Sequence, residues 1–71
     1  MLVKDILQKC DNSIFVYDQN MNIIYKYNSK TNEYKCVNYL PLEYVKTLEV
    51  EKITVSDNCI FLDVHVLDLP W

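Results

Sequence analysis

The stretch Ile53-Thr-Val-Ser-Asp-Asn-Cys-Ile-Phe-Leu-Asp-Val64 decides the fold, because two β-rich runs flank the dipeptide Asp57-Asn58. Asp and Asn tolerate the positive φ angles of a two-residue hairpin turn, and this chain has no Gly to use instead. A two-residue turn also fixes the register of the hairpin. One face, which we expect to be the core, pairs Val55 with Ile60 and Ile53 with Leu62 and continues through Val64 and Val66.

The same register requires an irregularity further from the turn. The opposite face pairs Thr54 with Phe61, Lys52 with Asp63 and Val50 with His65. Without a break, Glu49 and Glu51 would lie on the core face opposite valines, which would bury two carboxylates without partners. We therefore predict a β-bulge near Glu51 and Lys52, which returns Leu48 and Val50 to the core and turns both acids to solvent.

Nearer the N-terminus, polar breaks between β-branched and aromatic runs predict a three-stranded meander. Its strands are Ser13–Asp18, Asn22–Asn28 and Glu33–Asn38. If the second loop has four residues, Tyr27 lies opposite Tyr34 and Tyr25 lies opposite Cys36. These pairs would give the sheet a tyrosine-lined face.

Two short helices complete the predicted fold. An apolar stripe at helical spacing predicts an amphipathic helix over residues 2–10. Pro41 suits the first turn of a second helix, whose apolar stripe consists of Leu42, Tyr44, Val45 and Leu48. The 71 residues leave room for a single domain, residues 1–71. The sequence thus predicts an α+β fold, an antiparallel sheet of about five strands (meander plus C-terminal hairpin) with two short helices.

Composition narrows the class of protein. Hydrophobic residues make up 51% and charged residues 24%, as in globular proteins. We find neither a signal-peptide pattern nor an apolar run of membrane-spanning length, so we expect a cytoplasmic protein without membrane association. Cys10, Cys36 and Cys59 are odd in number, which predicts reduced and mostly buried thiols rather than a disulfide framework.

Negative charge is concentrated at the C-terminal end. Residues 49–71 sum to -4, whereas residues 1–48 sum to +1. The five acids are Glu49, Glu51, Asp57, Asp63 and Asp68. Such a surface attracts a partner with a basic surface. Trp71 follows a proline, so it either folds back onto the core, which we favour, or anchors another protein. These six residues form the candidate partner-binding set.

Asp63 and His65 are the candidate metal ligands. They stand two residues apart on one strand face, where their side chains could converge on a zinc ion. A third ligand would have to come from elsewhere, from Cys36, Glu49 or Asp68. We favour the alternative in which Asp63 pairs with Lys52 and His65 packs on Val50, because dispersed ligands lack zinc-site spacing. We therefore expect no cofactor, with zinc as the exception to test.

Charge and residue content argue against two further functions, direct nucleic-acid binding and catalysis. Six tyrosines could form a surface on which nucleic-acid bases stack, but a net charge of -3 and a pI near 4.8 oppose direct binding of phosphate backbone. Lys26, Lys30 and Lys35 gather around the second loop of the meander, and we interpret them as a solvated face. His65 is the only histidine, and no nucleophile, base and oxyanion set is recognisable, so we expect no enzyme activity.

The overall profile is that of a very small, acidic, glycine-free chain, rich in Asn, Lys, Ile and Tyr, with an acidic hairpin over Glu49–Asp68. In this profile it resembles small phage or prophage-encoded inhibitors, including anti-CRISPR proteins. The resemblance implies stoichiometric binding to a host or defence protein, often at a basic nucleic-acid channel, without turnover. We therefore predict a non-catalytic protein-binding module; a zinc-binding domain and a tyrosine-faced nucleic-acid binder are the alternatives. Exposed edge strands are compatible with either a monomer or a homodimer.

Overall fold

The C-terminal hairpin is present in the computed structural model, which describes residues 1–8, 12–36 and 40–67. It consists of β4 (Val50–Ser56) and β5 (Cys59–Val64). Asp57 and Asn58 have φ angles of 50° and 63°, the two positive values of a type I′ turn. The strand partners agree with the predicted register from Ser56–Cys59 to Lys52–Asp63.

The predicted β-bulge is confirmed. The register shifts between Val50 and Lys52, so that Val50 pairs with Val64 and not with His65. Leu48 is buried and Val50 packs against the core, whereas both neighbouring glutamates are exposed. One extra residue in β4 thus keeps two carboxylates in water without breaking the hairpin.

The N-terminal meander forms with the predicted pairs Tyr27–Tyr34 and Tyr25–Cys36. Its strands are β1 (Ser13–Tyr17), β2 (Ile23–Asn28) and β3 (Glu33–Cys36). Residues 37 and 38 of the predicted third strand lie outside the described residues. The loop between β1 and β2 is held by the buried Asp18 carboxylate, which accepts hydrogen bonds from the backbone N–H groups of Asn20 (2.8 Å) and Asn22 (2.9 Å).

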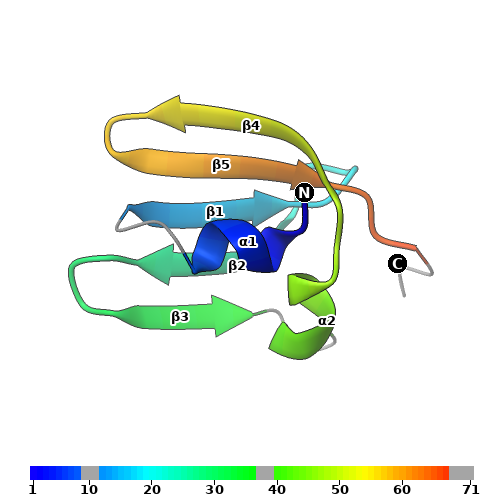
Figure 1. The fold of residues 1–71 in the computed structure, drawn as a ribbon, viewed down its shortest axis with the longest axis horizontal. Helices are drawn as coiled ribbons and strands as arrows, with labels where there is room; N and C mark the ends of the chain where they lie inside the picture. Colours follow the sequence, from blue (N-terminus) through cyan, green and yellow to red (C-terminus); the bar gives the residue numbers. More distant parts are fainter. Residues whose placement is uncertain (9–11, 37–39, 68–71) are drawn as a thin grey trace.

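The described strands form one sheet in the order β3-β2-β1-β5-β4. The chain passes from β3 at one edge, through α2 (Leu42–Lys46), to β4 at the opposite edge, and the hairpin then places β5 between β4 and β1 (Figure 1). Because of this path, β5 lies beside β1 and runs parallel to it, and the other pairs are antiparallel. The α+β class is therefore confirmed, with a mostly antiparallel sheet that contains one parallel pair.

The Gln19 side chain extends the parallel pair beyond its last strand residues. Its Nε2 donates to the carbonyl oxygen of Val66, and its Oε1 accepts from the N–H of the same residue, both at 2.9 Å. A side-chain amide presents the same donor and acceptor as a peptide group. The Gln19 side chain therefore bonds to the backbone of Val66 as one more β1 residue would, beyond the end of β5.

The two helices pack on one face of the sheet and close the core. The described part of the first, α1 (Val3–Leu7), is shorter than the predicted span of 2–10, and residues 9 and 10 lie outside the described residues. Its start is fixed by Asp5, whose carboxylate accepts from the N–H of Leu2 at 3.0 Å. Val3 and Ile6 from α1 and Val45 from α2 are buried in a single cluster with side chains of β1, β2 and β5.

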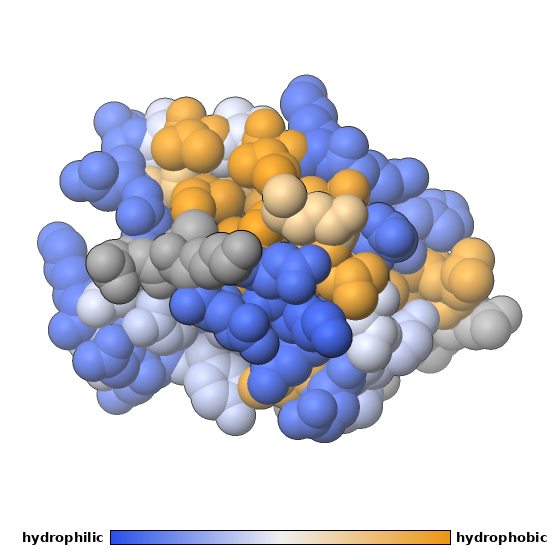
Figure 2. All heavy atoms as spheres, viewed as in Figure 1, coloured by the Kyte–Doolittle hydropathy of each residue, from blue (hydrophilic) through white to orange (hydrophobic). Residues whose placement is uncertain are grey.

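The expectation that Ile53 and Val55 belong to the core is wrong. They are 46% and 64% exposed, although their partners Leu62 and Ile60 are buried. A helix of about 10 Å diameter covers about two strands spaced 4.8 Å apart, and α1 lies over β1 and β2 (Figure 1). Hydrophobic side chains consequently remain visible along the β4 side of this face (Figure 2).

Candidate functional site

The acidic side chains predicted to bind a partner are spread along the β4 border of the sheet. Glu49 and Glu51 lie at the start of β4 and Asp57 lies in the turn at its end, and all three are exposed. Glu51 and Asp57 are six positions apart along extended chain, a distance of about 20 Å. Glu49 is also 3.3 Å from the ammonium group of Met1. The structure therefore shows a border flanked by acids rather than one dense acidic cluster.

The remaining members of that set are not on this border. Asp63 projects from the opposite face to the helices, and its partner across the hairpin is Lys52, as predicted. Asp68 and Trp71 lie outside the described residues, so the predicted fold-back of Trp71 stays a prediction. In the described part of the hairpin, the exposed negative charges are thus mainly those of Glu51 and Asp57.

The backbone of β4 has an unpaired outer edge. Ser56 and Cys59 flank the two-residue turn and exchange hydrogen bonds, so alternation directs the N–H and C=O groups of Val55 and Ile53 away from β5. The N–H of Val50 donates to the carbonyl oxygen of Met1 at 2.8 Å, which closes the start of this edge. From Lys52 to Ser56, no strand among the described residues pairs with the side of β4 that faces away from β5. We call this stretch the outer edge of β4.

The predicted zinc ligands do not acquire a third partner among the described residues. His65 is exposed beyond the end of β5, and Asp63 is half-buried. No three His, Cys, Asp or Glu side chains in residues 1–8, 12–36 and 40–67 lie close enough to hold a metal ion. Cys36 is on β3, at the other edge of the sheet, where burial raises the pKa of its thiol and disfavours the thiolate that zinc requires. The prediction that His65 packs opposite Val50 is wrong, since the bulge places Val64 there.

The sheet face opposite the helices, here called the open face, carries an aromatic ladder that the sequence reasoning missed. Phe15 and Phe61 are direct partners on β1 and β5, and their rings stack with centroids 5.4 Å apart and planes 15° apart. Tyr17 stacks on the same Phe61 ring at 6.3 Å. All three rings are half-buried, and no described helix or strand covers them. Alternation within each strand could have placed the rings on this face, but their contact depends on the parallel β1–β5 pair.

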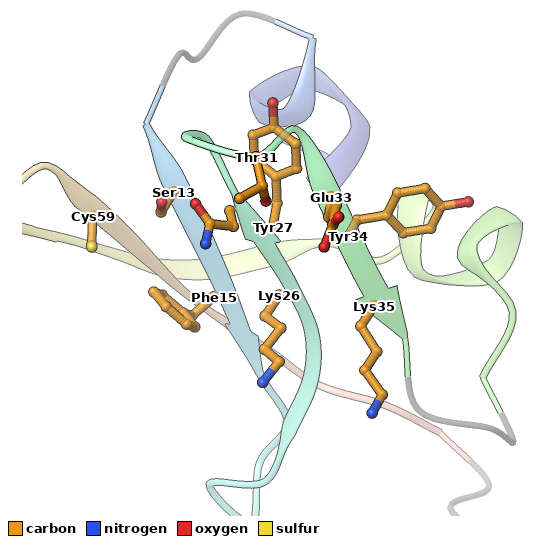
Figure 3. A pocket seen from close by; sticks show the side chains of 10 residues that line it. Ser13, Phe15, Lys26, Tyr27, Thr31, Glu33, Tyr34, Lys35 and Cys59 are labelled. Carbon is orange, nitrogen blue, oxygen red and sulfur yellow. The ribbon is translucent and has the colours of Figure 1, made fainter.

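Two lysines continue this ladder towards β3. Lys26 is the partner of Phe15, and Lys35 is the partner of Lys26, so Lys35, Lys26, Phe15 and Phe61 form one row across four strands. The two lysine side chains extend in the same direction from neighbouring strands, and Lys26 lies between Phe15 and Lys35 (Figure 3). We call these four residues the lysine–aromatic row.

A hollow of about 570 Å³ lies along the lysine–aromatic row. Its lining includes Ser13, Phe15, Lys26, Asn28, Glu33 and Lys35. Ser13 and Glu33 lie at the end nearest the β2–β3 loop, and the two lysines lie at the other end (Figure 3). Asn28, the strand partner of Glu33, also lines the hollow. The hollow therefore offers a flat ring surface between a polar end and a basic end.

The predicted tyrosine-lined face is the helix-covered side of the sheet and not the open face. Tyr25 is buried in the core, its ring stacks on Tyr34 at 6.0 Å, and Tyr27 packs against the core. Burial raises the pKa of Tyr25 to about 12, with the neighbouring Cys36, Tyr27 and Tyr34 adding to the shift. Tyr25 is thus structural, whereas Tyr34 is 57% exposed and lines the hollow together with Tyr27. The stacked rings of the open face are those of Phe15, Phe61 and Tyr17.

No protein-family model, no curated protein and no solved structure matches this chain. None of the helices in the described residues is both long and apolar enough to span a membrane.

Proposed function

We propose that this protein is a small non-catalytic protein-binding module, which uses the outer edge of β4 to add an extended segment of a partner with a basic surface. The observation that carries the proposal is that the stretch from Lys52 to Ser56 pairs with β5 on one side and with no described strand on its outer side. Strand addition supplies main-chain hydrogen bonds for affinity and leaves alternate side chains to set specificity. The outer edge of β4 provides both kinds of contact.

Side chains on this edge suit an incoming strand that is apolar on one face. Ile53 and Val55 project on the helix side and are about half and two-thirds exposed, so apolar residues of an added strand would cover them and extend the core. Glu51 and Asp57 stand at the two ends of the unpaired stretch. A segment with lysine or arginine near both of its ends would therefore match the edge in charge as well as in hydrogen bonding.

The charge pattern also suggests the class of partner. A basic surface on a cytoplasmic protein commonly serves nucleic-acid handling. We therefore propose a partner among nucleic-acid-handling host or defence proteins, and an inhibitor of the anti-CRISPR type as the biological setting. In that setting one copy of the chain would occupy the basic surface stoichiometrically and no reaction would follow.

A variant of the backbone edge tests the proposal directly. Val55→Pro removes an N–H that faces away from β5, and proline is tolerated at such edge positions. We expect proteins captured from a host lysate by the wild-type chain to be lost with Val55→Pro, while the variant keeps its circular dichroism spectrum and melting temperature. Val55→Thr, which keeps the N–H, is the matched control and should retain the captured protein.

Charge reversal tests the acidic ends separately. Glu51→Lys with Asp57→Lys should weaken capture and abolish its sensitivity to salt, whereas reversal of the exposed Glu33 and Glu43 should not. Sedimentation of the purified chain distinguishes a second possible occupant, another copy of itself. A dimer that dissociates with Val55→Pro would assign the edge to self-association and overturn the proposed partner.

A further inference from the structure

We propose that the hollow on the open face binds a small planar anion of the nucleotide class, with its phosphate between Lys26 and Lys35 and its ring on Phe15. This site is separate from the outer edge of β4, which lies at the other side of the sheet. It rests on the lysine–aromatic row and on the shape and chemistry of the hollow.

The first step is the pairing of two like charges. Lys26 and Lys35 are direct cross-strand partners, an arrangement that destabilises a sheet. Neither ammonium group forms an ion pair with an acid of the described residues; Glu33, the nearest acid in the register, pairs with Asn28 two residues along the strands. A bound anion would relieve the repulsion and would be attracted by both charges at once. The pair therefore marks the place for an anionic group.

The second step is the ring surface beside that charge. Phe15 is the partner of Lys26, and Phe61 supports the Phe15 ring from behind by stacking at 5.4 Å. Side chains on neighbouring strands stand about 5 Å apart, close enough for one ligand to touch both the ring and the ammonium group. A planar ring joined to an anionic group is the chemistry that this neighbourhood recognises.

The third step is the polar end of the hollow. The Glu33 carboxylate can only accept hydrogen bonds when ionised, and it would take them from amino or hydroxyl groups of a ligand. Ser13 and Asn28 add neutral polar groups on the neighbouring strands. A nucleotide carries all three parts: a phosphate, a planar base, and hydroxyl or amino donors.

Size and total charge favour a single nucleotide over a nucleic-acid strand. A volume of about 570 Å³ lies within the usual range of small-ligand sites, about 300 to 1,000 Å³. The whole chain has a net charge of -3, which repels a long polyanion, and two lysines do not make a track for a phosphate backbone. The local positive charge is sufficient only for a ligand that stays within the hollow.

Amide NMR titration of the full chain tests the proposal, with the four ribonucleoside 5′-monophosphates as probes and inorganic phosphate and adenosine as partial probes. We expect saturable shifts at Phe15, Lys26 and Lys35 for at least one nucleotide, and weaker binding of either partial probe. Lys26→Gln with Lys35→Gln should weaken binding at least about tenfold. Lys4→Gln with Lys46→Gln removes the same charge elsewhere and should have little effect.

Three outcomes would overturn the inference. One is the absence of saturable shifts at millimolar nucleotide, and another is equal loss of affinity in the two double-lysine variants. The third is tighter binding of a single-stranded oligonucleotide than of any mononucleotide, which would assign the open face to a nucleic-acid strand. Val55→Pro should leave nucleotide binding unchanged, so failure of this site and failure of the β4 edge are distinguishable.

Discussion

Truncating the cross-strand pair Leu62 and Ile53 one residue at a time should give very different losses of stability. The two side chains are direct partners on the same face of the hairpin, yet Leu62 is 0% exposed and Ile53 is 46% exposed. We expect Leu62→Ala to lower the free energy of unfolding by about 2–5 kcal/mol. Ile53→Ala should lower it by only about 1 kcal/mol.

The difference follows from what surrounds each side chain. Leu62 lies between Val16 and Ile53 on neighbouring strands and belongs to the buried cluster that includes side chains of both helices, so truncation leaves a cavity as well as losing apolar burial. Complete burial of an isoleucine is worth about 1.5–3 kcal/mol, and Ile53 is only about half removed from water. Its truncation faces solvent and creates no cavity. A few tenths of a kcal/mol of strand preference add to that loss.

Urea denaturation monitored by circular dichroism measures both losses of unfolding free energy. A loss of 1 kcal/mol lowers the melting temperature by about 4–8 °C in a chain of this size. A domain of 71 residues has about 4–11 kcal/mol in total, so Leu62→Ala can be too unstable to show a native baseline. Leu62→Val and Ile53→Val remove fewer atoms and lower stability less, and Leu62→Val should again lose more stability than Ile53→Val. Equal losses at both positions, independent of protein concentration, would refute the idea that the helices leave the β4 border uncovered.

Other regions of the fold give sharp expectations. Gln19→Ala removes two hydrogen bonds to Val66 and should cost about 1–2 kcal/mol, with faster hydrogen exchange at the Val66 amide in NMR; unchanged exchange would contradict this. Tyr25 has a pKa raised from 10.0 to about 12, so its neutral form stabilises the fold fully below pH 10, and that contribution is lost as pH rises from 10 to about 12. Tyrosinate absorbance should show a late-titrating group that is absent in Tyr25→Phe. Asn58→Ala should destabilise the hairpin by about 1 kcal/mol and Asn58→Gly should not, because only glycine adopts the φ of 63° freely; equal unfolding midpoints would count against the turn assignment.

Local features of the fold could be predicted from the sequence because they depend on neighbouring residues. Turn chemistry at Asp57-Asn58 sets the hairpin register, and the cost of burying Glu49 and Glu51 leads directly to the bulge. The parallel β1–β5 pair was not predictable in this way, since no local pattern states which strands become neighbours in a sheet. The exposure of Ile53 was not predictable from local patterns either. Alternation assigns a side chain to one face of the sheet, but the width of the helix layer decides how much of that face is covered.

The candidate surfaces were predictable only in part. The charge of the C-terminal hairpin could be counted, and the lysines around the β2–β3 loop were visible as a group. The lysine–aromatic row was not, because Phe15 and Phe61 are far apart in sequence and meet only when β5 lies beside β1. Tyrosine content was misleading, because Tyr25 and Tyr27 face the helices and help to close a small core.

The parallel pair at the centre of the sheet also divides the molecule into two folding units. The meander β1-β2-β3 and the hairpin β4-β5 each form through contacts close in sequence, whereas Ser13 and Cys59, joined across the seam, are 46 positions apart. Closing that long loop is the slow, entropically costly event, so substitutions along the seam should retard folding, and those within the outer strands should mainly hasten unfolding. The basic hollow is built mostly from the first unit and the acidic edge belongs to the second. Each surface can therefore change through substitutions in its own unit while the seam keeps both in one protein.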